Sequence, residues 1–280
     1  MNEISLDTLG MTIAGLRGGS KSGKRCLCIH GWMDNAASFV PLQAAMPELD
    51  MVALDLPGHG KSDHFPAGHH YHLIDQVAYV LAAADALGWD DFNLVGHSLG
   101  GCIAPFVAVA APERIKNLIM LEALGPVTEP AEELPARVKR ASVAMRQDSN
   151  RLKRVYASID DAVEARMLAT RMQRASAHLI VERNLRLADG AYVWAYDSRL
   201  RSPSSSYLTE EQVLAVLGAV SQQTLCVLAT DGYLLKREPS KRRIDALMHA
   251  AVVEVAGHHH MHMDDPEASA GAIRTFLLHN

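Results

Sequence analysis

Short apolar runs alternate with longer helical patterns along most of the 280-residue chain. The runs are rich in Val, Leu and Ile and lack a polar face, which is typical of parallel strands covered by helices on both sides. The predicted strands are residues 25–31, 50–58, 92–98, 117–124, 224–232 and 252–257. The predicted helices are residues 36–46, 72–87, 99–111, 240–250 and 266–279. This order predicts an α/β fold with a mostly parallel sheet flanked by helices.

A long insertion interrupts this alternation in the second half of the chain. It is amphipathic and rich in Arg, Ala and Met, and its apolar positions have the period of a helix. Because the strand pattern resumes at Thr224, we interpret residues 126–205 as a helical cap on one core formed by residues 1–125 and 206–280. Three methionines are candidates for an apolar pocket wall or for packing between cap and core: Met145, Met167 and Met172.

Composition and charge exclude several classes of protein. Hydrophobic residues make up 49% and charged residues 21%, which is typical of globular proteins and excludes disordered and coiled-coil chains. The net charge of -5 argues against nucleic acid as a partner. No apolar run reaches the roughly 18 residues of a membrane span, and the first residues lack the features of a signal peptide. We therefore expect a cytoplasmic monomer or homodimer that acts on a small molecule.

Cysteine and histidine, the residue types most used in redox chemistry and metal binding, form no recognisable metal motif. The cysteines lie in apolar segments, so we expect reduced core thiols; they are Cys26, Cys28, Cys102 and Cys226. Histidine is unusually frequent, with 14 residues. One group lacks any cysteine or paired carboxylate at a metal-site spacing, and we expect it at the surface; it contains His64, His69, His70 and His72.

The motif Gly96-His97-Ser98-Leu99-Gly100 lies where the predicted strand 92–98 meets the predicted helix 99–111. A serine in such a sharp turn has a strained backbone and an exposed hydroxyl. It also lies at a helix N-terminus, whose dipole favours developing negative charge. The motif therefore predicts that Ser98 is a nucleophile.

A serine nucleophile needs a base, and a histidine run follows the last predicted strand. Spacing alone does not choose among its members, which are His258, His259, His260 and His262. An orienting carboxylate is expected at the end of another strand. Asp231 is favoured by the chain order Ser, Asp, His, and Glu122, which ends the predicted strand 117–124, is the alternative. The backbone N–H groups of Trp32 and Leu99 are the predicted oxyanion donors.

Together these motifs resemble the α/β-hydrolase superfamily, and within it the serine hydrolase-like proteins. The resemblance covers almost the whole chain through HGW, DLPGHGKSD, GHSLGG and GHHHMHMDDPE. It implies that His259, seven positions before Pro266, is the base, and that His258 is the second choice because it stands where glycine is usual. The sequence ATDG around Asp231 departs from the commoner G-x-x-D, which keeps Glu122 as an alternative acid.

We expect a metal-independent serine hydrolase without a cofactor, which cleaves carboxylic esters of small or medium acyl groups through an acyl-enzyme on Ser98. Thioesters, lactones or carbon–carbon bonds are alternative substrates for the same residues. A ligand-binding module that keeps the hydrolase scaffold without turnover is the alternative from another class. Serine at position 98, instead of aspartate, argues against the epoxide hydrolase and haloalkane dehalogenase branches.

Overall fold

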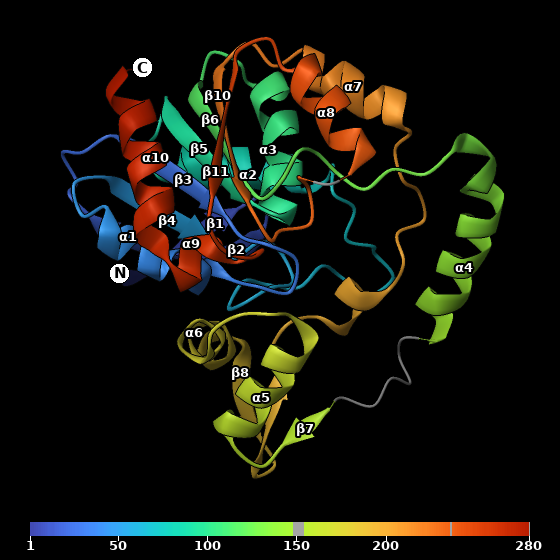
Figure 1. Ribbon diagram of the computed structural model, residues 1–280. Coiled ribbons are helices and arrows are strands. Elements are labelled where there is room, and N and C mark those ends of the chain that lie inside the picture. The colour runs from blue at the N-terminus through green and yellow to red at the C-terminus, as the bar shows by residue number, and fades with distance from the viewer. Residues whose placement is uncertain (148–153, 236, 280) are drawn as a thin grey trace.

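A central eight-stranded sheet organises the computed structural model, which describes residues 1–147, 154–235 and 237–279 (Figure 1). In spatial order its strands are β1 (Asn2–Thr8), β2 (Met11–Gly19), β4 (Asp50–Leu54), β3 (Arg25–Ile29), β5 (Phe92–His97), β6 (Ile115–Leu121), β10 (Gln223–Ala229) and β11 (Ala250–Val255). All six predicted strands are present and run parallel to one another. The prediction of a mostly parallel α/β sheet is confirmed.

The first two strands form an antiparallel hairpin that the sequence analysis did not predict. Strand β2 pairs antiparallel with β4 and so adds the hairpin to one edge of the parallel sheet. The strands are joined by Leu9 and Gly10, which both have positive φ values, 49° and 77°. Such a turn normally carries Asn-Gly or Asp-Gly, so leucine in the first position hides the usual signal.

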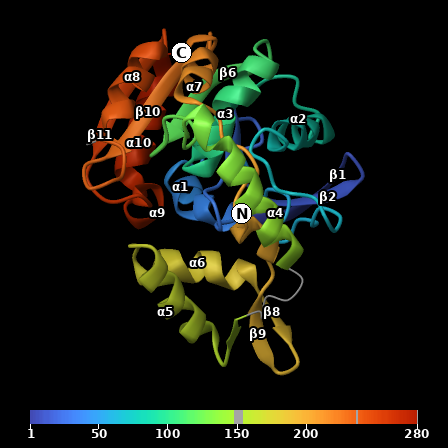
Figure 2. The same cartoon turned by 90° about the vertical axis from the view of Figure 1, so that its right-hand side faces the viewer.

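Helices cover both faces of the sheet (Figures 1 and 2). One layer contains the short 3-10 helix η1 (Ala36–Phe39), α1 (Val40–Ala45), α9 (Met261–Asp264) and α10 (Pro266–His279). The other contains α2 (Gln76–Ala86), α3 (Leu99–Ala110), α7 (Glu210–Gly218) and α8 (Glu238–Ala246). In the described part of the chain, no helix has the length and apolar character that crossing a membrane requires.

Strand β3 shows why its apolar run has no polar face. Cys26 and Cys28 pack in the cluster that contains α1 and α10, whereas Leu27 and Ile29 pack in the cluster that contains α2 and α3. All four side chains are completely buried, since each face of a parallel sheet meets a helical layer. The two cysteines share one side of the strand and are free thiols, as predicted.

The inserted segment follows β6 and contains strands as well as helices. Its elements are η2 (Ala131–Glu133), α4 (Leu134–Gln147), β7 (Val155–Tyr156), α5 (Ile159–Ala169), α6 (Arg174–Asn184), β8 (Leu185–Ala188), β9 (Ala191–Trp194) and η4 (Ser198–Arg201). Figures 1 and 2 show α5, α6 and the small sheet grouped beyond one end of the core. The order of this antiparallel sheet is β7-β9-β8. Asp189-Gly190 between β8 and β9, with φ values of 50° and 79°, is a standard hairpin signal that would have predicted it.

The predicted pocket methionines pack differently from one another. Met167 and Met172 join an apolar cluster that includes Val163 and Ile180 of the inserted segment and Met263 of α9. Met145 lies half-buried on α4. Met167 and Met172 therefore fit the alternative interpretation, in which the methionines pack elements against one another.

Buried polar contacts dock α6 onto the core. The Arg183 guanidinium forms a buried ion pair with Asp55, with Nη2 2.8 Å from Oδ2. Nearby, the Asn35 side-chain amide donates to the carbonyl of Ile180 over 2.8 Å. Asn35 and Asp55 follow β3 and β4, so the inserted segment covers the edge where the parallel strands have their carboxyl ends. Sites in open α/β sheets form at this edge.

Candidate active site

Ser98 lies in a tight turn between β5 and α3. Its φ and ψ values of 49° and -110° are strained for any residue other than glycine. The turn is held on both sides, because Ser98 N–H donates to the Leu121 carbonyl and Gly100 N–H donates to the His30 carbonyl, each over 3.0 Å. A Cβ atom at Gly100 would overlap the Ile29 carbonyl, so the motif's second glycine is required for this close approach. The structure thus builds the strained turn that the motif predicts.

His259 reaches the Ser98 hydroxyl. Its Nε2 lies 2.9 Å from Ser98 Oγ, from the segment that links β11 to α9. The pKa of His259 is lowered to about 4, mainly by burial and to a smaller extent by the nearby His260. A neutral imidazole with its lone pair on Nε2 can accept the serine proton. The alternative base, His258, has no hydrogen bond to Ser98.

The two candidate carboxylates occupy different environments. Asp231 is exposed in the turn after β10, and its side chain makes no hydrogen bond or ion pair with the described residues. Glu122 is only 2% exposed and directly follows β6. Its Oε1 accepts a hydrogen bond from Tyr233 N–H and its Oε2 accepts one from Ala229 N–H, each over 2.7 Å. Burial raises the pKa of Glu122, and these hydrogen bonds oppose the rise.

The Glu122 carboxylate lies against the turn that follows β10. A Cβ atom at Gly232 would overlap this carboxylate, which therefore fills the space that a side chain at position 232 would take. The next residue, Tyr233, packs its ring 4.6 Å from the His259 ring. Glu122 is thus linked to the base through Tyr233, while Nδ1 of His259 is buried and has no hydrogen-bond partner among the described residues.

The predicted oxyanion donors belong to two segments beside the Ser98 turn: the start of α3 and the loop after β3. Leu99 is the first residue of α3, and Trp32 lies in the loop after β3. Within the described residues neither backbone N–H donates a hydrogen bond, so both remain available to a ligand oxygen. The Trp32 side chain is 53% exposed, and its indole N–H donates to the Leu200 carbonyl of the inserted segment over 3.1 Å.

Several buried histidines surround this site. Five histidines besides His259 are at most 2% exposed: His30, His59, His97, His260 and His262. Asp34, which is not among the predicted site residues, is 1% exposed. Its Oδ2 lies 3.3 Å from His260 Nε2. Its other oxygen pairs with Arg166 of α5. In the sequence, the sign of this role was a carboxylate two residues after the HGW motif. That sign was not enough to predict the role, because the residues that contact Asp34 come from distant segments.

A serine turn after a central parallel strand, with an imidazole at its hydroxyl, defines the class of α/β serine hydrolases. The profile of the family described as alpha/beta hydrolase fold matches residues 26–266, and the chain belongs to this family.

Individual comparisons agree with the family match. A serine hydrolase-like protein of Danio rerio is 31% identical over 270 residues, covering 92% of this chain and 83% of that protein. A crystal structure of a hypothetical protein from Pseudomonas aeruginosa PAO1 is 34% identical with a TM-score of 0.93, covering 100% of this chain and 99% of that one. A thioesterase domain from the curacin biosynthetic pathway shares the fold, with 24% identity, a TM-score of 0.84 and 99% coverage of both chains. Within the family, this hydrolase belongs to the serine hydrolase-like subgroup.

Proposed function

We propose that this hydrolase cleaves carboxylic esters of small or medium acyl groups through an acyl-enzyme on Ser98. The observation that carries the proposal is the 2.9 Å contact between Ser98 Oγ and His259 Nε2 at a strained strand-to-helix turn. No metal or cofactor takes part in the proposed reaction, because the nucleophile, the base and the oxyanion donors all come from the chain.

The first half of the reaction forms the acyl-enzyme. His259 Nε2 takes the proton of Ser98 as Oγ attacks the ester carbonyl carbon. The backbone N–H groups of Trp32 and Leu99 hold the resulting oxyanion. When the tetrahedral intermediate collapses, the carbon–oxygen bond to the leaving group breaks, and His259 returns its proton to the departing alkoxide.

The second half releases the acid. His259 removes a proton from water, the hydroxide oxygen attacks the acyl carbon, and the same two N–H groups hold the new oxyanion. The bond to Ser98 Oγ then breaks, and Oγ recovers a proton from His259 as the carboxylic acid leaves.

We assign the role of the positioning carboxylate to Glu122 in preference to Asp231. Glu122 is buried and held by two backbone N–H groups, and it supports the turn whose Tyr233 packs on His259. An ionised carboxylate at this position stabilises the imidazolium that forms during catalysis. The solvent-exposed side chain of Asp231 is poorly suited to this role, since water screens its charge.

Hydrolysis of chromogenic short-chain esters tests the proposal. Wild type should turn over the acetyl or butyryl ester, and Ser98→Ala should lose at least about 10⁴-fold in kcat, as other serine triads do. Ser142→Ala on the exposed surface of α4 is the matched control and should keep wild-type activity. Inactive wild type against ester, thioester and lactone panels would favour the ligand-binding module, and an active Ser98→Ala would reject the acyl-enzyme.

A further inference from the structure

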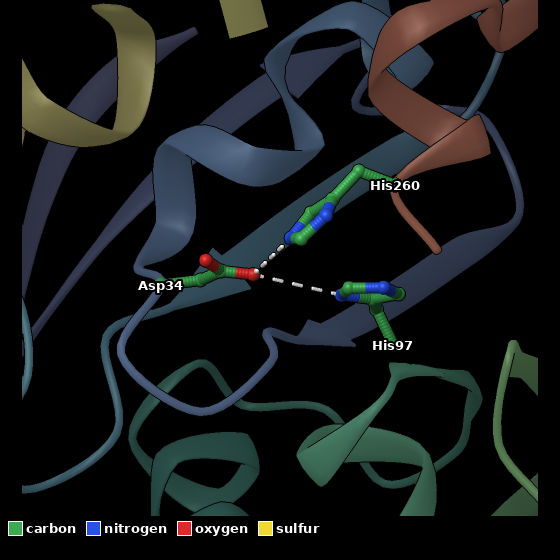
Figure 3. Close-up of side chains that lie close together, drawn as sticks. All are labelled: Asp34, His97 and His260. Carbon is green, nitrogen blue, oxygen red and sulfur yellow. Dashed lines mark hydrogen bonds and ion pairs between the residues drawn. The ribbon is translucent and has the colours of Figure 1, made fainter. Parts of the chain in front are cut away.

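Three residues from separate segments converge beneath the catalytic serine and histidine. Asp34 follows β3, His97 ends β5, and His260 precedes α9. Figure 3 shows both imidazole rings directed at the same carboxylate oxygen. His260 Nε2 lies 3.3 Å and His97 Nδ1 lies 3.7 Å from Asp34 Oδ2, and the three ligand atoms all lie within 4.8 Å of one another. All three residues are at most 2% exposed.

The hydrogen bonds of His97 leave a lone pair facing the carboxylate. His97 Nε2 lies 2.9 Å from the backbone carbonyl of His259, and a carbonyl only accepts, so this nitrogen carries the hydrogen. In the neutral ring Nδ1 then has a bare lone pair, which is buried without a hydrogen-bond partner and is directed at Asp34 Oδ2. Two electron-rich atoms in this arrangement repel unless a positive charge lies between them.

We propose that Asp34 Oδ2, His97 Nδ1 and His260 Nε2 form a binding site for a divalent transition-metal ion such as Zn²⁺. Ligands 2.0–2.1 Å from a tetrahedral ion lie about 3.3 Å apart, close to the separations of 3.3 and 3.7 Å from Asp34 Oδ2. The two imidazole nitrogens, which lie within 4.8 Å of one another, move closer together when they bind one ion. Two imidazoles and a carboxylate are suitable ligands for zinc and its neighbours. His262 adds a further imidazole, with both nitrogens buried and unpartnered and its ring centroid 4.1 Å from that of His97.

Groups around two of the three ligands, His97 and Asp34, have the arrangement that metal sites require. Metal-binding histidines usually donate their other N–H to a carbonyl or carboxylate, as His97 does to the His259 carbonyl. Metal-binding carboxylates are in turn hydrogen-bonded, as Asp34 Oδ1 is by Arg166. The positive charge of Arg166 also opposes a second cation, so the site should bind more weakly than a closed structural zinc site.

Metal binding should also inhibit the reaction, an expectation that rests on the proposed function. His97 precedes Ser98 in the chain and His260 follows His259, so drawing the two ligands toward one ion shifts the neighbouring catalytic residues. The 2.9 Å contact between Ser98 and His259 depends on their present positions. A small misplacement of catalytic groups is enough to lower the rate strongly.

Calorimetric titration of chelator-treated protein with zinc chloride tests the site. We expect one Zn²⁺ per chain in wild type, and at least about tenfold weaker binding in Asp34→Asn and in His260→Gln, since loss of even an outer-shell partner costs that much. The double variant His70→Gln, His72→Gln changes the histidine pair of the other group and should bind like wild type. Absence of binding in wild type, or wild-type binding in Asp34→Asn, would reject the site.

X-ray absorption of the zinc-loaded wild type gives a second measurement that needs no variant. We expect at least two imidazole ligands and one oxygen ligand at about 2.0–2.1 Å from the metal. A spectrum with fewer than two imidazoles would reject the site even if the variants failed to fold. A bound ion in a protein inactive on all esters would reject the proposed function alone, and an active protein without bound zinc would reject the metal site alone.

Discussion

At the scale of single residues, the candidate chemistry depends on how Ser98 and His259 are held against each other. Ser98 is held in a strained turn, and the residue before it, His97, contacts the backbone of the candidate base. The Ser98 hydroxyl contacts His259, the one of four neighbouring histidines that the family resemblance favours as the base. The choice between the two carboxylates depends on burial, because only a carboxylate shielded from water interacts strongly with a developing imidazolium.

Exchanging each carboxylate for its amide tests the assignment of Glu122. We expect Glu122→Gln to lower kcat by about 10³ to 10⁴-fold, as loss of the orienting acid does in other triads. Asp231→Asn, the exposed counterpart, should change kcat less than about tenfold. Steady-state ester hydrolysis measures both, and circular dichroism checks that each variant is folded.

A positioning role also predicts a change that simple loss of stability does not produce. Glu122→Asp keeps the charge and should recover part of the kcat that Glu122→Gln loses, with KM little changed. Equal kcat for the two Glu122 variants, or a large loss in Asp231→Asn, would contradict the assignment.

At the scale of elements, two hairpins and one buried ion pair decide how the segments fit together. The hairpin of β1 and β2 extends the parallel sheet at one edge, and that of β8 and β9 completes the inserted segment. Helix α6 then docks through Arg183, whose partner Asp55 is completely buried and also accepts hydrogen bonds from Ala36 N–H and Lys61 N–H. Polar contacts of this kind fix one position of the helix, because few other positions satisfy the same groups.

Removing the charge of Arg183 should destabilise the protein strongly. Arg183→Met leaves Asp55 buried without its counter-charge, and breaking such a pair costs about 3–5 kcal/mol in the free energy of unfolding. Urea unfolding followed by circular dichroism measures the change.

The matched control lies on the same helix. Arg174 pairs with Asp160 and Glu164 at the surface, so Arg174→Met should change stability little. Similar midpoints for the two variants would show that the buried pair does not dock the inserted segment.

At the scale of the whole molecule, one sheet collects every candidate group at a single edge. The ends of β3, β5, β6, β10 and β11 supply the oxyanion loop, the serine, the two carboxylates and the histidine run. The inserted segment covers this edge through Arg166 and Arg183. The candidate catalytic groups therefore belong to the core, and the inserted segment packs against them.

Treatment with a strong chelator should leave ester hydrolysis intact. The proposed nucleophile, base and oxyanion donors belong to the chain, so removing metal takes nothing from the reaction. Initial rates before and after chelation, with zinc added back in excess, provide the measurement. Loss of activity on chelation that zinc restores would contradict a metal-independent reaction.

Much of the fold and part of the site could be predicted from the sequence. Fully buried strands such as β3 leave an unbroken apolar run, which survives in the one-dimensional pattern. Strands β1 and β2, joined by the atypical Leu9-Gly10 turn, and the short strands β7–β9 leave a weaker signal and were not predicted. Ser98 was predictable because its turn needs glycine neighbours, and these leave a local motif.

What the sequence by itself determined was the order of the six parallel strands, the serine turn and the membership of the hydrolase family, because each of these depends on residues close together in the chain. Only the tertiary structure brought Asp34 to His97 and His260, buried Glu122 and paired the inserted segment's arginines with the core. These contacts join residues about 60 to 230 positions apart. Burial and long-range electrostatic pairing depend on which segments pack together, and no local pattern of residues specifies that.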